Sequence, residues 1–485
     1  MSAQKIPLGK RMVAALGTVA VAFMALFGAG AAAHAAPAGP GNIDFEKTDG
    51  SIIVHKHAQP NPAGDPADGS DLGVIDNPLE GVEFTVQKVE NIDLSDETQW
   101  AQLQDLTAAD IDPADLETPG STLVTRADGT AEFTDLEVGV YYVTEGEDTG
   151  NNNIVRKVDP FLVIIPTAID GEWEYTVHVY PKNSLTEVTK TLNEDADDAA
   201  EGAGDIISWD ITSTAPVLAP EDEFTELRLV DTLDERLMFE SITEVTYGGA
   251  ALEEADYEVT SSTNADGADV VTFELTEAGL AKVAANDGQQ LAYALNTSVR
   301  EGADIGNGVI ENEVTQYTTI NEQEFDFTTP PTITNWGYVN IFKQDADNQL
   351  GLGDAEFQIF RTEAEAADPA NSDPIAVHGQ TTFTTDENGE LVIGPLNAGA
   401  ENLREYWVVE TKAPAGYQLD QTPQPVDVSA GANAELVYTL DNVKQPDFEL
   451  PLTGSTGTMV FLGAGLLLLM SGGGLYLRNR ARSAA

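Results

Sequence analysis

The stretch GEWEYTVHVYPKN, residues 171–183, alternates apolar and polar side chains up to a proline. Such alternation is typical of a half-buried β-strand, and Pro181 marks the point where this strand enters a turn. Successive side chains of a strand point to opposite faces, so Val177 shares a face with Asn183 and not with Lys182. The pattern predicts an inward asparagine directly after an outward lysine, at the end of a sheet.

The length and composition of the chain limit the kinds of protein that it can be. The chain has 485 residues, enough for about three domains of ordinary size. Its formal net charge of −59 disfavours nucleic acid as a partner, because a phosphate backbone would be repelled. It contains no cysteine, so disulfides and thiolate metal sites are excluded and any covalent cross-link must use other chemistry.

Short strands separated by glycine, proline, asparagine and aspartate fill residues 36–183, which indicates an all-β sandwich. The strands expected here are residues 51–56, 82–89, 139–145 and 161–165. The polar insertion at 93–119 is expected to hold short helical turns. The first domain is therefore predicted to be a β-sandwich that ends at the opening stretch.

Two further units follow, at residues 184–335 and 336–446. In the first of these we expect strands and one helix, at 277–286; the expected strands are 186–190, 206–212, 227–233, 270–275, 291–299 and 309–317. The last unit repeats the first domain, since GVEFTVQ at 81–87 matches DAEFQIF at 354–360. The expected fold class is all-β, with three tandem immunoglobulin-like sandwiches in an elongated rod.

The two ends of the chain carry targeting patterns. Basic residues, an apolar run and small residues make residues 1–35 a predicted secretory signal peptide, with a retained membrane anchor as the alternative. Residues 447–485 hold an apolar run at 459–477, long enough for a bilayer, and then an arginine-rich tail. The pentapeptide directly before that run is Leu450, Pro451, Leu452, Thr453 and Gly454. A permanent transmembrane anchor is the alternative reading of this end.

The last unit aims three polar groups at one apolar core. By strand parity Lys343, Glu410 and Asn442 point inward, and burying them unpaired would cost several kcal/mol, so they are expected to meet. In such a core desolvation favours a neutral amine and a protonated carboxyl group. These are the forms that attack of a lysine on an asparagine carboxamide requires. The product would be an isopeptide bond, with loss of ammonia.

The other two units carry comparable sets. In the first unit the same parity holds for Lys56, Glu145 and Asn183, and whether this bond forms is left open. In the middle unit Lys190 and Asn312 are the expected partners. Asp231 is the preferred acid there because it lies in line with the apolar residues of its strand, and Asp210 is the alternative.

Two motifs resemble one known family. The spacing of Trp173 and VHVYPKN (177–183) resembles the pilin motif, and YWVVETKAPAGY (406–417) resembles the E-box, of sortase-assembled major pilins of Gram-positive bacteria, the SpaA and FimA types. The pentapeptide resembles the LPXTG cell-wall sorting signal. Glu145 is a departure, because the second half of the E-box does not follow it.

The resemblance implies CnaB-like, CnaA-like and CnaB-like domains in that order, with Glu410, Asp231 and Glu145 assisting isopeptide formation. It further implies that a sortase cuts after Thr453 and joins it to Lys182 of the next subunit. The chain would then be no enzyme but the shaft subunit of an adhesive fimbria anchored to peptidoglycan on the cell surface. Its partners would be other copies of itself, pilin-specific and housekeeping sortases, and tip or accessory pilins.

Other readings stay open. A monomeric wall-anchored adhesin would share these modules but would not use Lys182, and an anchored enzyme lacks a catalytic constellation in the sequence. No cofactor is expected. Asp345, Asp347 and Asn348 offer oxygen ligands for calcium but not a full EF-hand loop, so a solvated acidic turn is preferred. His55 and His57 are expected on the strand surface and not as metal ligands.

Overall fold

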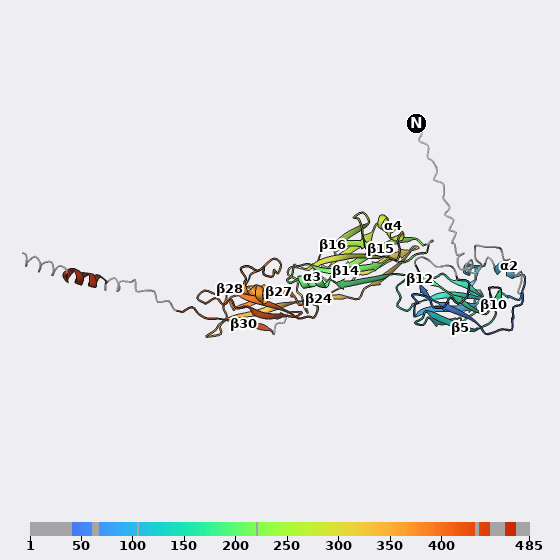
Figure 1. The fold of residues 1–485 in the computed structure, drawn as a ribbon, viewed down its shortest axis with the longest axis horizontal. Coiled ribbons are helices and arrows are strands. Elements are labelled where there is room, and N and C mark those ends of the chain that lie inside the picture. The colour runs from blue at the N-terminus through green and yellow to red at the C-terminus, as the bar shows by residue number, and fades with distance from the viewer. Residues whose placement is uncertain are drawn as a thin grey trace, which may run out of the picture.

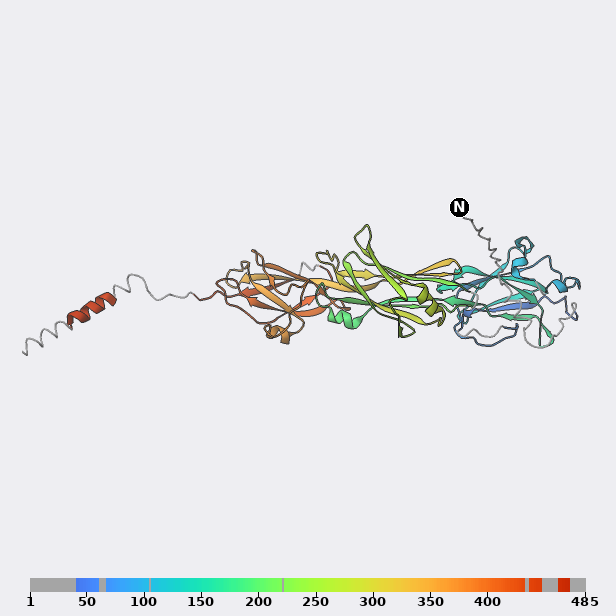
Figure 2. The same ribbon diagram turned by 90° about the horizontal axis from the view of Figure 1, so that it is seen from above.

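The computed structural model describes residues 41–60, 67–103, 106–219, 222–431, 436–446 and 461–471. Three β-sandwiches lie end to end in a row (Figure 1), and the view from above shows the same elongated arrangement (Figure 2). The expected all-β fold of tandem sandwiches is confirmed. The predicted signal peptide and the sorting pentapeptide lie outside the described residues.

The first sandwich packs two main sheets around an apolar core. The sheet orders are β11-β1-β5 and β4-β3-β6-β8. Their strands are β1 (Gly50–His55), β3 (Val82–Lys88), β4 (Ser121–Val124), β5 (Thr130–Leu136), β6 (Gly139–Thr149), β8 (Phe161–Ile165) and β11 (Thr176–Val179). Ile52, Phe84 and Phe133 meet between the sheets and are buried. The insertion holds α2 (Trp100–Leu103) and the 3-10 turns η1 (Ala108–Asp110) and η2 (Pro113–Asp115), as expected.

The opening stretch is not one strand, and this corrects the expectation. It divides into β10 (Glu172–Glu174), which pairs with β9 (Thr167–Ile169), then β11, then β12 (Lys182–Leu185). Pro181 has no N–H to donate to a ladder, so the chain leaves the first sheet there. Strand β12 joins a separate small sheet between β2 (His57–Ala58) and β7 (Ile154–Arg156), with Lys182 opposite His57.

The second sandwich has two five-stranded sheets, β13-β14-β20-β16-β17 and β18-β19-β15-β22-β23. The strands are β13 (Glu187–Leu192), β14 (Ile207–Thr214), β15 (Phe224–Thr232), β16 (Leu237–Tyr247), β17 (Ala250–Ala251), β18 (Tyr257–Thr263), β19 (Asp269–Leu275), β20 (Gln290–Val299), β22 (Thr315–Ile320) and β23 (Gln323–Thr328). Trp209 is fully buried at its centre.

Two expectations for this unit were wrong. The run 309–317 is two strands in different sheets, β21 (Val309–Asn312) and β22. Besides the expected helix α4 (Glu277–Ala284) there is α3 (Glu194–Ala199), which begins where the Asn193 side chain accepts a hydrogen bond from the Ala196 N–H. Acidic residues in the first turn of α3 also complement the helix dipole.

The third sandwich begins within a strand shared with the second. Strand β24 (Thr332–Asp345) pairs at its start with β21 and further on with β27 (Glu390–Asn397) and β30 (Val437–Asn442). The opposing sheet is built from β25 (Glu356–Phe360), β26 (Phe383–Thr384), β28 (Arg404–Lys412) and β29 (Gln424–Val428), and the short helix α5 (Glu363–Ala367) packs on β28. The expected change of domain at 335/336 therefore falls inside a continuous strand.

Hydrogen bonds and ion pairs hold the second and third sandwiches together. Asn397, which is fully buried, donates to Asp197 Oδ1 at 2.9 Å, and Arg404 pairs with Asp198 at 2.8 Å. The first and second sandwiches meet through an ion pair of Arg156 with Asp222 at 3.2 Å. Residues 461–471 form a helix, and no helix within the described ranges has the length and apolarity needed to cross a bilayer.

Candidate functional site

Each sandwich buries one lysine beside an acid and an asparagine. Lys56 is 0% exposed, Lys190 5% and Lys343 2%. Lysine is almost never fully buried unless it is paired. The structure brings together all nine residues that strand parity had selected. The three clusters differ in their contacts, so each is described in turn.

The first cluster forms a closed triangle of hydrogen bonds. Lys56 Nζ donates to Glu145 Oε2 at 2.9 Å and also to Asn183 Oδ1. Asn183 Nδ2 in turn donates to Glu145 Oε1 at 2.5 Å. The backbone N–H of Val158 donates to Asn183 Oδ1 at 3.1 Å. One carboxyl group thus contacts both the amine and the amide nitrogen, while a backbone donor holds the carboxamide oxygen.

Burial shifts the titration of this lysine. Desolvation lowers the pKa of Lys56 to about 8, although the charge of Glu145 opposes the shift. The Glu145 side chain is 1% exposed. A buried ammonium loses its hydration, so the neutral amine becomes accessible near physiological pH. A neutral amine has the lone pair that a nucleophile needs.

The second cluster reaches across the sandwich. Lys190 extends from β13 in one sheet and its amine donates to the Asp231 carboxylate on β15 in the other. Burial lowers the pKa of Lys190 to about 8 and raises that of Asp231. Asn312, on β21, lies near enough to Asp231 to affect its pKa, yet no well-formed hydrogen bond joins them. Asp210 instead accepts from Asn193 at 3.0 Å.

The third cluster lies beside a small cavity of about 160 Å³. Lys343 Nζ is 3.6 Å from Glu410 Oε1, and Asn442 Nδ2 donates to Glu410 Oε2 at 3.0 Å. The backbone carbonyl of Gln418 accepts a second hydrogen bond from Asn442 Nδ2, at 2.5 Å. Burial lowers the pKa of Lys343. The acid again lies between the amine and the amide.

The buried unpaired side-chain atoms of the described residues fall only in the second and third clusters. They are Asp231 Oδ1, both terminal atoms of Asn312, Glu410 Oε1 and Asn442 Oδ1. An unsatisfied buried polar group costs about 1–3 kcal/mol, and native proteins carry few. The second and third clusters thus hold buried polar atoms without partners, whereas the first is a closed set of hydrogen bonds.

An aromatic ring lies beneath each buried amine, which the sequence reasoning did not select. The centroid of Phe84 is 5.6 Å from Lys56 Nζ, that of Trp209 is 5.3 Å from Lys190 Nζ, and that of Phe357 is 5.7 Å from Lys343 Nζ. Phe84 and Phe357 occupy the same position of the repeated EF dipeptide, so the repeat itself was an available signal. The sequence contains no such signal for Val158, because its contact with Asn183 is made by the backbone N–H.

Lys182 lies apart from the clusters although it adjoins Asn183. Its side chain is half-buried, and burial lowers its pKa. None of the described residues hydrogen-bonds or ion-pairs with its amine. Its neighbour His57 has a pKa lowered to about 4, by burial and then by the charge of Lys182. The amine is thus partly desolvated and has no partner among the residues that the structure describes.

The expected solvated acidic turn is exposed at Asp347 and Asn348 but not at Asp345, and the histidines differ from the expectation. Asp345 is buried, and its carboxylate accepts from Tyr417 at 2.9 Å and pairs with Lys444 at 2.9 Å. Protein donors therefore occupy the Asp345 carboxylate, one of the groups that a calcium ion would need. His55 and His57 are each 8% exposed, so their expected place on the strand surface was wrong.

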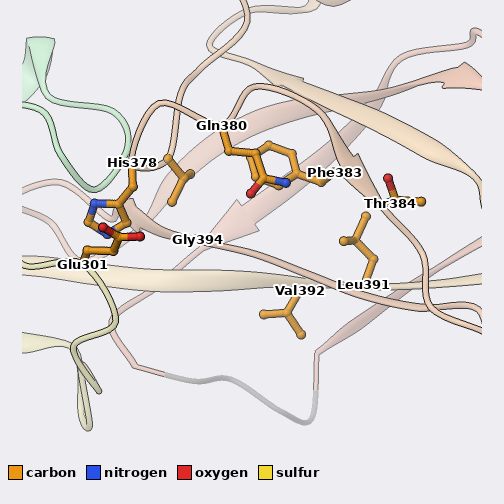
Figure 3. Close-up of a pocket in the computed structure, with 9 residues that line it drawn as sticks. Glu301, His378, Gln380, Phe383, Thr384, Leu391, Val392 and Gly394 are labelled. Carbon is orange, nitrogen blue, oxygen red and sulfur yellow. The ribbon is translucent and has the colours of Figure 1, made fainter.

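A pocket of about 330 Å³ lies where the second sandwich meets the third (Figure 3). Glu301 and His378 lie side by side at one end of it, and Phe383 and Leu391 line the part farther from them. It takes no residue from the lysine clusters.

Comparisons with known proteins agree with the order of the sandwiches. Residues 47–184 match the Gram-positive pilin subunit D1, N-terminal domain; 187–326 the Sgo0707 N2 domain; 337–443 a prealbumin-like fold domain; and 442–483 the LPXTG cell wall anchor motif. Fimbrial subunit type 2 of Actinomyces naeslundii is 34% identical, covering 98% of this chain and 97% of the relative. The chain belongs to the sortase-assembled major pilins of Gram-positive bacteria.

Two further proteins place this pilin within the family. Fimbrial subunit type 1 of Actinomyces viscosus is 31% identical, covering 98% of each chain. The full-length major pilin SpaD from Corynebacterium diphtheriae superposes with a TM-score of 0.68 at 27% identity, over 84% of this pilin and 99% of SpaD. The pilin is a structural protein of a cell-wall-anchored surface pilus and not an enzyme.

Proposed function

We propose that this pilin is the repeating shaft subunit of a fimbria, joined covalently from Thr453 of one copy to Lys182 of the next and cross-linked internally by three lysine–asparagine bonds. The observation that carries the proposal is the arrangement of the clusters: in every sandwich an acid pairs with a buried lysine, and in the first and third sandwiches it also accepts a hydrogen bond from a buried asparagine. The family supplies the setting, a polymer on the cell wall.

The first cluster supports a complete route for bond formation. The neutral Lys56 amine attacks the side-chain carbonyl carbon of Asn183, and the Val158 N–H stabilises the charge that develops on Oδ1. Glu145 takes the proton from the attacking nitrogen and gives one to the departing amide nitrogen, which it already contacts. Ammonia leaves and the amide carbon is joined to Nζ. No oxidant or cofactor is needed.

The unpaired atoms support the same reaction in the other two sandwiches. A free asparagine at 312 or 442 leaves polar atoms buried without partners. Amide formation replaces a buried amine and a buried carboxamide by one amide and removes the lysine charge from the core. The reaction therefore relieves a desolvation cost that the unbonded fold carries.

The setting of Lys182 supports its role in the polymer. A nucleophile for a sortase acyl intermediate must be reachable and at least partly deprotonated. Lys182 is half-buried, has a lowered pKa and has no protein partner within the described residues. If Asn183 is bonded to Lys56, the residue that follows Lys182 is fixed covalently in the core, and the outward direction of the Lys182 side chain is fixed with it.

Cell-wall extracts boiled in SDS and probed with antibody to this pilin test the proposal. Lys182→Ala is expected to collapse a high-mass ladder to monomer. Lys88→Ala is the matched control, because this lysine of the same sandwich is paired with Glu137 at 2.7 Å on the surface. An unchanged ladder in Lys182→Ala would contradict the linkage through this lysine. If the wild type itself gave only monomer, the alternative function, a monomeric wall-anchored adhesin, would be favoured.

A further inference from the structure

Two histidines and an aspartate converge on the outer face of the first sandwich. His55 comes from β1 and His178 from its parallel neighbour β11, while Asp71 comes from the loop that precedes β3. Four of the five histidines lie beyond the predicted signal peptide, so half of those four meet here. None of the three residues belongs to a lysine cluster.

The geometry of these side chains is close to that of a metal site. His55 Nε2 and His178 Nδ1 share a hydrogen bond of 2.8 Å, which a bound ion would replace, and His178 Nδ1 lies 3.9 Å from Asp71 Oδ1. All three candidate ligand atoms lie within 4.8 Å of one another. Tetrahedral Zn²⁺ with ligands at about 2.1 Å needs neighbouring ligand atoms about 3.4 Å apart. The two separations of 2.8 and 3.9 Å differ from this value by roughly half an ångström, and the third, within 4.8 Å, by at most about 1.4 Å, so side-chain shifts of about that size would seat an ion.

Neighbouring groups orient His55 and Asp71. The Tyr180 ring stacks on His55 with centroids 4.6 Å apart, and its hydroxyl donates to Ser70 O at 3.2 Å and accepts from Leu72 N at 2.7 Å. These two bonds hold the backbone on both sides of Asp71. The N–H of Gly73 donates to Asp71 Oδ1 at 2.8 Å. Such supporting contacts fix metal ligands in other proteins.

The charge of the chain also suits a cation. The net charge of −59 attracts cations to the chain as a whole. Two imidazoles and one carboxylate are ligands that Zn²⁺ prefers, whereas Ca²⁺ and Mg²⁺ prefer sites made entirely of oxygen.

We propose that His55, His178 and Asp71 bind a transition-metal dication such as Zn²⁺, with water completing a tetrahedron. The ion would fasten the loop around Asp71 to the strand that leads into Pro181 and Lys182. The site stands on its own geometry and does not depend on covalent polymerisation.

Calorimetric titration of the full chain with ZnCl₂ tests the site, in excess Mg²⁺ to occupy the many surface carboxylates. One saturable equivalent is expected, with affinity lowered at least tenfold by His178→Gln and by His55→Gln. Asp71→Asn is expected to weaken binding as well. Because Asp71 lies on an exposed loop, this variant tests the site without disturbing the core. His378→Gln, in the third sandwich, is the matched control and is expected to bind like the wild type.

Co²⁺ supplies a second readout. The visible absorption of tetrahedral Co²⁺ is expected with the wild type and the His378 variant and is expected to vanish with the His178 variant. Equal Zn²⁺ affinity in the wild type and all three site variants, or no saturable binding above Mg²⁺, would overturn the proposal.

Discussion

A lysine amine in an apolar core is stable only if its charge is paired or removed, and this pilin supplies the means for both at three places. Lys56, Lys190 and Lys343 each lie against an acid, which pairs the ammonium, and near an asparagine, which can remove it by forming an amide. An aromatic ring beneath each amine covers one side of it with apolar surface. In the proposed reaction the acid is the residue on which the chemistry depends.

We therefore expect Glu145→Gln to abolish the bond between Lys56 and Asn183, because glutamine cannot carry the proton between the two nitrogens. Intact mass spectrometry should find three ammonia molecules missing from the wild type, about 51 Da, and two missing from the variant. Glu147→Gln is the control, since that side chain is 98% exposed. If Glu145→Gln still lacked three ammonia molecules, the bond would form without the Glu145 carboxyl group, and the proposed role of Glu145 would be wrong.

The change of stability with pH is an independent test of whether Lys56 is bonded to Asn183. With the bond absent, as in Asn183→Ala, Lys56 titrates at about 8 in the fold and at its ordinary 10.5 when unfolded. Between these values the unfolded chain binds more protons, so stability rises with pH, by roughly 3 kcal/mol in all for this group.

The bonded wild type has no titrating amine there and should lack this rise. Calorimetric melting of the first sandwich from pH 7.5 to 10.5 measures the difference between the two chains. Parallel pH profiles for wild type and Asn183→Ala would mean that Lys56 is a free amine in both.

Strand parity was sufficient to select the residues of the clusters because a strand has only two faces and a buried charge must find a partner. It selected Asp231 over Asp210 for the same reason, and Asp231 is the acid that contacts Lys190. It could not find Val158, whose N–H contact depends on the path of the loop before β8. It also misplaced His55, because strand parity does not show that a loop covers the outer face.

At the scale of elements, the separation of outward lysine from inward asparagine depends on Pro181. The proline ends pairing in β11, and β12 begins a new sheet in which Lys182 lies opposite His57. The sequence predicted the turn but not the second strand, since four residues of β12 carry no clear period. The helix α3 was missed for a related reason: it has only six residues, and its acidic composition resembles a loop.

The element that ties the second sandwich to the third is β24, supported by one buried asparagine. Asn397→Ala is expected to lower the stability of the third sandwich by about 2–4 kcal/mol, because Asp197 and the Gly399 N–H would lose buried partners. Thermal unfolding followed by calorimetry measures the loss. Asn371→Ala, on the exposed loop after α5, should change little, and equal melting of the two variants would show that this junction does not stabilise the sandwich.

At the scale of the whole molecule, the proposed links define which parts of the pilin carry tension. Force would enter at Lys182 and leave at Thr453, so the strands of the first sandwich up to β11 lie outside the loaded segment. The Lys190–Asn312 and Lys343–Asn442 bonds would bypass most of the other two sandwiches. Within the segment that bears the force, residues 313–331 form a hairpin. The two ends of this hairpin are held together where Asn312 pairs with Thr332.

Single-fibre force spectroscopy should therefore find a small extension for each subunit, at most about 60 Å from release of residues 313–331. Asn312→Ala should extend to about 500 Å, because the whole second sandwich can then unravel. Asn183→Ala should extend no further than the wild type, since the first sandwich bears no load. A long extension in Asn183→Ala would show that force does not enter at Lys182.

The covalent joint between copies is the centre of this account, and protease digestion of purified fimbriae followed by mass spectrometry of branched peptides tests it most directly. We predict a peptide in which the carbonyl carbon of Thr453 is joined to Nζ of Lys182. Recovery of Lys182 with a free amine, together with Thr453 joined to another lysine, would contradict the account.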